Sequence, residues 1–115
     1  DLGAATVECG WSMRRPSQSY VDLLARCMNA GAAIRRSGSG ALGLADVAAG
    51  RAEAYAELHI NAWDCAAGLV LVTEAGGFVN DFFAGDGVRA GNPLIATNAA
   101  LSSKLAKVIG IPIKN

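Results

Sequence analysis

The sequence has 115 residues, of which 52% are hydrophobic and 6% aromatic, enough for one domain with a hydrophobic core. Its 10 basic and 10 acidic residues sum to a formal net charge of zero, so no charged surface for nucleic acid or for an anionic membrane is expected. Every apolar stretch is shorter than the roughly 20 residues that a membrane-spanning helix needs. We therefore expect a soluble protein without nucleic-acid or membrane partners.

Strands and helices are predicted to alternate along the whole chain. Hydrophobic spacing and turn residues place strands at 5–12, 32–36, 54–58, 78–81 and 94–97, and helices at 20–29, 41–49, 62–75 and 99–109. Ser17 or Ser19 is expected to cap the first helix, and residues 83–92 are predicted to form a polar loop. Such alternation is typical of an α/β fold. The strand, helix and strand between 32 and 58 further predict a parallel pair with a right-handed crossover.

The three cysteines, Cys9, Cys27 and Cys65, are odd in number and widely spaced. This spacing fits neither a zinc-binding pair nor a redox Cys-x-x-Cys motif. Free thiols are typical of a reducing compartment, where they commonly act as small buried hydrophobic residues. We therefore expect a cytoplasmic protein with buried cysteines.

A glycine-rich turn precedes the helix predicted at 41–49. The pattern Gly-x-Gly-x-x-Gly of dinucleotide-binding sites is matched by Gly38-Ser39-Gly40-Ala41-Leu42-Gly43, and Glu57 follows about twenty residues after the first glycine. The charged pair Arg35-Arg36 just before the turn argues against that function, because the preceding strand should be a buried apolar run. A dinucleotide-binding module stays an alternative, and the structural alternative is a tight turn that permits close packing.

The helix predicted after Asn61 is the central feature of the sequence. The Asn61 side chain can cap it, Asp64 lies in its first turn, and an almost wholly apolar run leads to Gly76 and Gly77, which end it. A helix that is apolar nearly all round is typical of a buried element. We therefore expect Trp63 to pack in the core and Asp64 to point outward at its edge, where the ordinary role of an Asp is to stabilise the helix dipole.

Two motifs of this region resemble a known family. Trp63-Asp64-Cys65-Ala66-Ala67-Gly68, followed by Glu74-Ala75-Gly76-Gly77, closely resembles the second signature of the inositol monophosphatase family. The resemblance extends upstream through Glu57 and the segments 47–51 and 38–42, and it covers most of residues 33–81. It implies the layered α/β/α/β/α fold of sugar phosphatases, with a mostly parallel sheet flanked by helices.

The resemblance also implies that residues 1–115 form a single α/β domain, the C-terminal part of a larger phosphatase. In the family the N-terminal half carries most of the metal ligands, and this sequence has no Asp-Pro-x-Asp-Gly-Thr stretch. We therefore expect the N-terminal half to be absent and the isolated chain to be inactive, a folded segment that holds only part of a site. Family members are commonly dimers, so a homodimer is implied as well.

Site residues are implied by the same resemblance. The turn that lies beside the substrate alcohol in the family is matched by Gly38, Ser39, Gly40 and Ala41. Glu57 matches the residue that accepts a hydrogen bond from a substrate hydroxyl, a role suited to a carboxylate. Asp64 matches a ligand of the second Mg²⁺, a cation that prefers oxygen ligands. No catalytic residue is assigned within the chain, because the water-activating residues belong to the N-terminal half.

The function implied is Mg²⁺-dependent hydrolysis of a small phosphate monoester, such as an inositol-1-phosphate-like polyol phosphate. Relatives of the same fold act on histidinol phosphate, fructose bisphosphate and phosphoadenosine-type nucleotides, so the sugar or nucleotide phosphate stays open. Arg35 aligns with an arginine of the family, or is a solvated surface charge. His59 has no partner for a triad or a zinc site and is predicted to be structural or at the pocket rim. Surface positions are predicted for Asp22, Asp46, Asp81 and Asp86.

Overall fold

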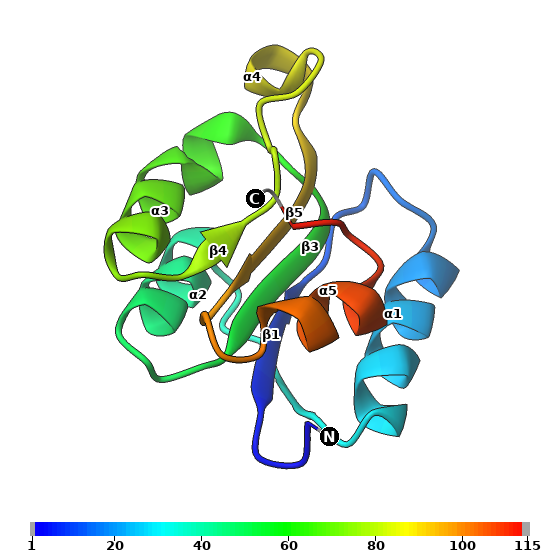
Figure 1. Ribbon diagram of the computed structural model, residues 1–115. Helices are drawn as coiled ribbons and strands as arrows, with labels where there is room; N and C mark the ends of the chain where they lie inside the picture. Colours follow the sequence, from blue (N-terminus) through cyan, green and yellow to red (C-terminus); the bar gives the residue numbers. More distant parts are fainter. Residues whose placement is uncertain (1, 114–115) are drawn as a thin grey trace.

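The computed structural model describes residues 2–113 as one central sheet with helices on both faces (Figure 1). The elements in chain order are β1 (Thr6–Gly10), α1 (Ser17–Asn29), β2 (Ala33–Arg35), α2 (Gly40–Ala48), β3 (Ala54–Ile60), α3 (Ala62–Glu74), β4 (Phe78–Val79), α4 (Gly87–Ala90), β5 (Asn92–Thr97) and α5 (Ser102–Ile109). This alternation confirms the predicted α/β class. None of the helices within residues 2–113 is both long and apolar enough to cross a membrane.

The sheet has the strand order β2-β1-β3-β5-β4. β1 pairs in parallel with both β2 and β3, whereas β5 pairs antiparallel with β3 and with β4. Four strands therefore share one direction and only β5 runs against them, which agrees with the expected mostly parallel sheet. The predicted crossover needs one correction: β2 and β3 are parallel, but β1 lies between them, so they are not hydrogen-bonded neighbours.

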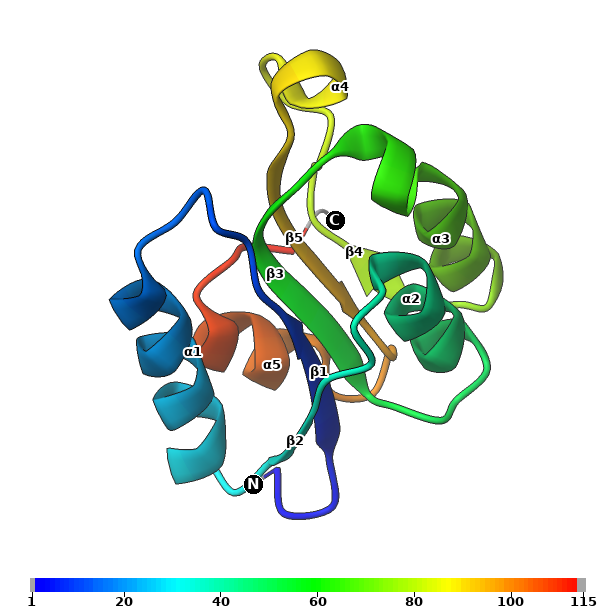
Figure 2. The ribbon, with the colours of Figure 1, turned by 180° about the vertical axis from the view of Figure 1, so that it is seen from behind.

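Two hydrophobic clusters, one on each face of the sheet, hold the layers together. α1 and α5 cover one face, and α2 and α3 cover the other (Figures 1 and 2). Side chains alternate along a strand, so in β3 Ala54 and Ala56 join the cluster beneath α1 and α5, while Tyr55 joins the cluster beneath α2 and α3. A sheet buried on both faces explains the high hydrophobic content of the chain. The three cysteines are buried and free, as predicted.

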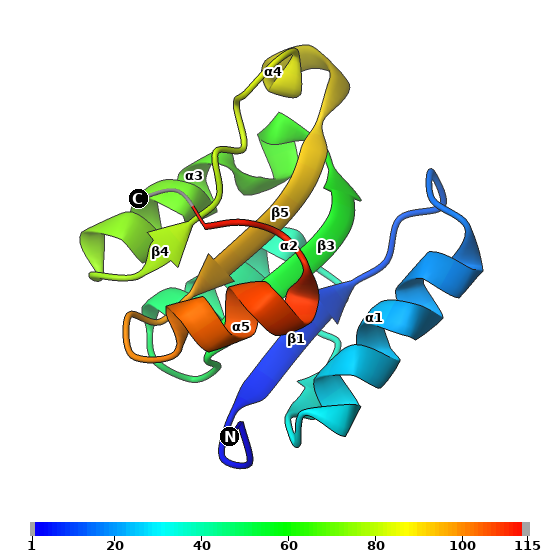
Figure 3. The ribbon, with the colours of Figure 1, turned by 45° about the vertical axis from the view of Figure 1, so that its right-hand side comes forward.

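Helix boundaries differ from the sequence prediction where a side chain has another partner. Asn61 occupies the cap position of α3 without a capping hydrogen bond, because its Oδ1 accepts from Arg14 Nη1 at 3.0 Å. α1 begins at Ser17 after Pro16, and neither predicted serine caps it. α5 begins only at Ser102, because Asn98 Oδ1 accepts from the Leu101 N–H and forms a turn ahead of the helix. The short helix α4 lies in the segment predicted as a loop and extends beyond the end of the sheet (Figure 3).

The expectation of a buried α3 is also wrong, because one side of this helix is open to solvent. Trp63 is 73% exposed, and Val70 and Leu71 are exposed further along the helix. An apolar groove of about 440 Å³ lies on this side, between α3 and the segment after β4 that carries Phe82 and Phe83. Trp63 was predicted to pack in the core, but it lies at the surface.

Candidate functional site

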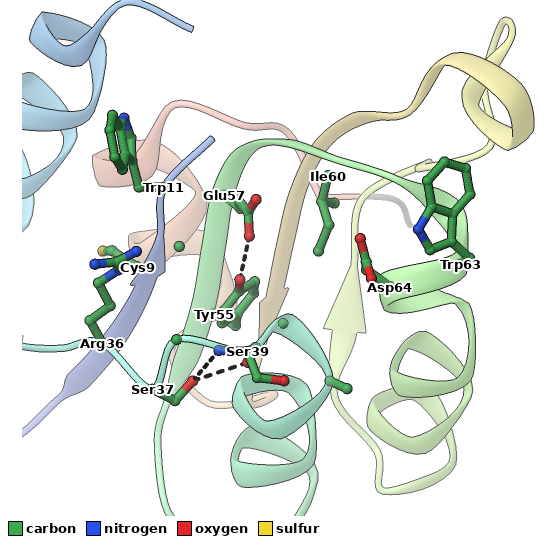
Figure 4. Close-up of a pocket in the computed structure, with 14 residues that line it drawn as sticks. Cys9, Trp11, Arg36, Ser37, Ser39, Tyr55, Glu57, Ile60, Trp63 and Asp64 are labelled. Carbon is green, nitrogen blue, oxygen red and sulfur yellow. Dashed lines mark hydrogen bonds between the residues drawn. The ribbon is translucent and has the colours of Figure 1, made fainter. Parts of the chain in front are cut away.

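One pocket of about 390 Å³ contains every site residue predicted from the sequence. It lies where the C-terminal end of β1, the middle of β3 and the first turns of α2 and α3 come together (Figure 4). Ligands of open α/β sheets bind at such a place, outside the carboxyl ends of parallel strands. The predicted residues that line it are Gly38, Ser39, Gly40, Ala41, Glu57 and Asp64.

The glycine turn forms one wall of the pocket. The Ser39 hydroxyl accepts a hydrogen bond from the Leu42 N–H at 3.3 Å and so caps α2, while the Ser37 hydroxyl donates to the Ser39 carbonyl at 3.0 Å. Gly38 has a φ of +81°, which a residue with a side chain rarely adopts. The first turn of a helix leaves N–H groups without partners inside the helix, so this wall suits an oxygen-rich ligand.

Glu57 reaches into the pocket from β3. Its carboxylate accepts a hydrogen bond from the hydroxyl of Tyr55, two residues earlier on the same face of the strand (Figure 4). Burial raises the pKa of Glu57 above its ordinary value, the nearby charge of Asp64 adds to this rise, and the Tyr55 hydrogen bond and Arg36 oppose it. Burial, followed by the contact with Glu57, raises the pKa of Tyr55 as well, so the phenol is the donor of this hydrogen bond.

Asp64 lies in the first turn of α3 on the side that faces Glu57 (Figure 4). A carboxylate oxygen is the kind of ligand that Mg²⁺ prefers, and this cation usually takes one or two carboxylates together with water and substrate phosphate. Within residues 2–113, however, no group of three or more His, Cys, Asp or Glu side chains is placed to hold a metal ion. Asp64 thus fits the role of one ligand but cannot form a complete site alone.

The pocket also contains residues that were not predicted to belong to it, among them Tyr55 and Arg36. Tyr55 was placed on a strand but not at the site, and its spacing of two from Glu57 was the available signal. Arg36 lines the pocket, whereas the neighbouring Arg35 does not.

Arg35 instead forms an ion-pair network on the α2 face of the sheet. Its Nη2 lies 2.9 Å from Glu8 Oε2 and 2.7 Å from Asp46 Oδ2, and Asp46 also binds Arg51 at 2.8 Å. Asp46 was predicted to be a surface residue, but its side chain is only 17% exposed and is held in this network. Burial of Glu8 raises the pKa of its carboxyl, whereas hydrogen bonds from the side chains around it hold the pKa of Asp46 below its ordinary value.

His59 has a structural role, as predicted. Its Nε2 lies 2.8 Å from the Ala90 carbonyl oxygen, and it is largely buried beside Arg14. This contact joins the end of β3 to α4, outside the pocket.

The glycine turn lacks the strand arrangement of a dinucleotide fingerprint. In that fold the strand before the glycines is buried inside the sheet and lies next to the strand that carries the acidic residue. Here the turn follows β2, an edge strand, and β1 separates β2 from β3, which carries Glu57. This topology argues against the dinucleotide-binding alternative.

Layered helices around a mostly parallel sheet, with a helix-capping glycine turn and two carboxylates in one pocket, define an α/β protein with a polar pocket of a size suited to a small ligand. The family model of the inositol monophosphatase family matches residues 5–111, and the chain belongs to this family. Members are phosphoric monoester hydrolases in general, which agrees with the resemblance seen in the sequence.

Individual relatives support the same assignment. The chain is 43% identical to the Nus factor SuhB of Xylella fastidiosa, and the match covers 95% of this chain and 42% of that protein. It is 44% identical to the inositol-1-monophosphatase of Mesorhizobium japonicum, and that match covers 70% of this chain and 30% of that protein. The solved structure of Mycobacterium tuberculosis SuhB superposes with a TM-score of 0.81 at 33% identity and covers 95% of this chain and 42% of that one. The chain thus spans less than half the length of these relatives.

Proposed function

We propose that this chain forms the substrate-binding part of a Mg²⁺-dependent phosphatase that hydrolyses a small polyol phosphate of the inositol-1-phosphate type. The observation that carries the proposal is the single pocket shared by the glycine turn, Glu57 and Asp64. Each of the three offers a different interaction to such a ligand: backbone N–H groups, a hydroxyl acceptor and a metal-binding oxygen.

The residues of the chain bind and orient the substrate in this proposal. The first turn of α2 approaches the substrate alcohol closely, since Gly38, Gly40 and Ala41 present little side chain there. Glu57 would accept a hydrogen bond from a substrate hydroxyl, and Asp64 would supply one oxygen ligand to Mg²⁺. When bound, Mg²⁺ would supply Lewis-acid polarisation of the phosphoryl group and a lowered pKa for a coordinated water.

The remaining metal ligands come, in this proposal, from a further part of a larger phosphatase, of which this chain is the C-terminal domain. The length of the relatives supports this, because the chain covers 42% of the Xylella fastidiosa protein. A homodimer and a cytoplasmic location are proposed on family grounds. The expectation of no nucleic-acid partner stays a prediction, since several relatives carry the name Nus factor.

A titration of the chain followed by amide NMR tests the proposal. We expect myo-inositol 1-phosphate to shift the amide signals of residues 38–41 and 57, with an affinity that Mg²⁺ increases. Glu57→Gln should weaken binding by about 5- to 10-fold, as the loss of a charge-assisted hydrogen bond predicts. Asp64→Asn should abolish the increase in affinity caused by Mg²⁺. Asp81→Asn, at an exposed position outside the pocket, should change neither the affinity for the ligand nor its increase by Mg²⁺.

The same titration distinguishes the alternatives. Shifts caused by NAD⁺ but not by the phosphate ester would support a dinucleotide-binding module. Equal losses of affinity in Asp64→Asn and Asp81→Asn would exclude a metal-binding role for Asp64.

A further inference from the structure

We propose that Tyr55 is a positioning residue that fixes the orientation of the Glu57 carboxylate in the pocket and keeps it a hydrogen-bond acceptor. This inference rests on the proposed function, because it concerns how Glu57 receives a ligand hydroxyl. Nothing in the sequence motifs assigns a role to this tyrosine.

The Tyr55 ring is fixed inside the protein while its hydroxyl reaches the pocket. Tyr55 is 3% exposed and packs in the cluster beneath α2 and α3, yet it also lines the pocket. A buried hydroxyl requires a hydrogen-bond partner, and Glu57 Oε1 is that partner. Because the ring cannot move freely, the direction of this hydrogen bond is set by the core.

Glycines leave the space that the Tyr55–Glu57 pair occupies. A Cβ atom at Gly43 of α2 would lie 2.6 Å from Tyr55 Cε1, and one at Gly10 of β1 would overlap both the Tyr55 hydroxyl and the Glu57 carboxylate. At Gly40 a Cβ atom would lie 3.4 Å from the Tyr55 hydroxyl oxygen. None of these three glycines has a positive φ, so close packing and not backbone conformation accounts for them.

The hydrogen bond also determines what the carboxylate can do. Within residues 2–113, Tyr55 is the one side chain that donates to Glu57, and it uses Oε1. Oε2 stays available to accept a hydrogen bond from a ligand hydroxyl. Burial and Asp64 favour the protonated form, whereas the Tyr55 hydrogen bond favours the ionised form, which is the form that accepts such hydrogen bonds.

Replacement of Tyr55 by Phe tests this role with a matched control. The chain has two tyrosines, and the hydroxyl of Tyr20 lies outside the pocket and reaches the Cys9 carbonyl at 3.5 Å. Tyr55→Phe should raise the pKa of Glu57, measured by ¹³C NMR of its carboxyl carbon, and should weaken myo-inositol 1-phosphate binding by about 2- to 10-fold. Tyr20→Phe should change neither quantity.

A second variant, Gly10→Ala, keeps the Tyr55 hydroxyl and the Glu57 carboxylate and adds a methyl group in the space that they occupy. Gly10→Ala should displace the pair and reproduce the rise in the Glu57 pKa, so the test does not depend on Tyr55→Phe alone. An unchanged Glu57 pKa in the folded Tyr55→Phe and Gly10→Ala variants would overturn the inference, as would a raised pKa with unchanged ligand affinity. If the parent chain binds no phosphate ester but Tyr55→Phe still raises the pKa of Glu57, the Tyr55–Glu57 contact is supported and the proposed function is rejected. Failure of the inference and failure of the proposed function are therefore distinguishable.

Discussion

Glu8 shows at the residue scale how strongly the fold depends on contacts between distant parts of the chain. Its side chain is fully buried in β1, where one oxygen binds Arg35 and the other, Oε1, has no hydrogen-bond partner within the described residues. Burial is the largest cause of the rise in its pKa; Asp46 adds to this rise and Arg35 opposes it. The folded protein therefore binds the Glu8 proton more tightly than the unfolded chain does.

This raised pKa predicts the direction of a pH effect on stability. Between pH 4.5, the ordinary pKa of Glu, and the raised pKa of folded Glu8, the folded state binds more protons than the unfolded state. The free energy of unfolding therefore decreases as the pH rises through this window. Glu8→Gln should flatten this slope in urea denaturation curves recorded between pH 4 and 8. The control is Glu74→Gln at an exposed position; equal slopes for the parent and Glu8→Gln would contradict the prediction.

The resemblance to a known family identified some pocket residues and left others out. The glycine turn, Glu57 and Asp64 could be predicted because each lies in a segment that resembles the inositol monophosphatase family, whereas local spacing alone favoured ordinary structural roles for them. The Glu8–Arg35 pair joins residues 27 positions apart, and the role of Asp46 depends on its ion pair with Arg35, which belongs to β2. No local pattern carries that information, so Asp46 was wrongly predicted to be a surface residue.

At the scale of elements, α2 and α3 pack closely because Gly68 faces Leu44. A Cβ atom at Gly68 would lie 2.6 Å from Leu44 Cβ, and that atom cannot rotate away. An alanine gains up to about 1 kcal/mol of helix propensity over glycine, but overpacking costs about 1–3 kcal/mol. The steric term is therefore expected to be the larger one.

Gly68→Ala should accordingly destabilise the chain by about 1–2 kcal/mol in urea denaturation. Ala67→Gly, at an exposed position of the same helix, measures the propensity term alone and should cost at most about 1 kcal/mol. A Gly68→Ala variant more stable than the parent would contradict this prediction and show that α2 and α3 can move apart without loss of stability.

The order of elements was predictable, whereas their ends and exposure were not. Alternating periodicity and glycine stops identified the strands and long helices. The Asn61 side chain was misassigned because its partner, Arg14, is 47 residues away. The exposed apolar side of α3 could not be predicted, because periodicity reports that a helix is apolar and not which part of the protein covers it.

For the whole molecule, the presence of only one proposed metal ligand in the pocket, Asp64, predicts a lack of turnover. Two-metal phosphoryl transfer requires ions that clamp both the attacking and the leaving oxygen, and the described residues offer no cluster of three ligands. The purified chain should release no phosphate from myo-inositol 1-phosphate above the uncatalysed rate at millimolar Mg²⁺, as a colorimetric phosphate assay would show. Robust Mg²⁺-dependent turnover by the 115 residues would contradict this prediction.

The strand order has a consequence for how copies of the chain meet in concentrated solution. The strands at the two edges of the sheet are the shortest in it: β2 spans three residues and β4 spans two. Long, flat edge strands are templates for adding strands from other molecules. The long inner strands are hydrogen-bonded on both sides, so a neighbouring chain finds only a few backbone groups at either edge, and we expect little growth of the sheet by strand addition.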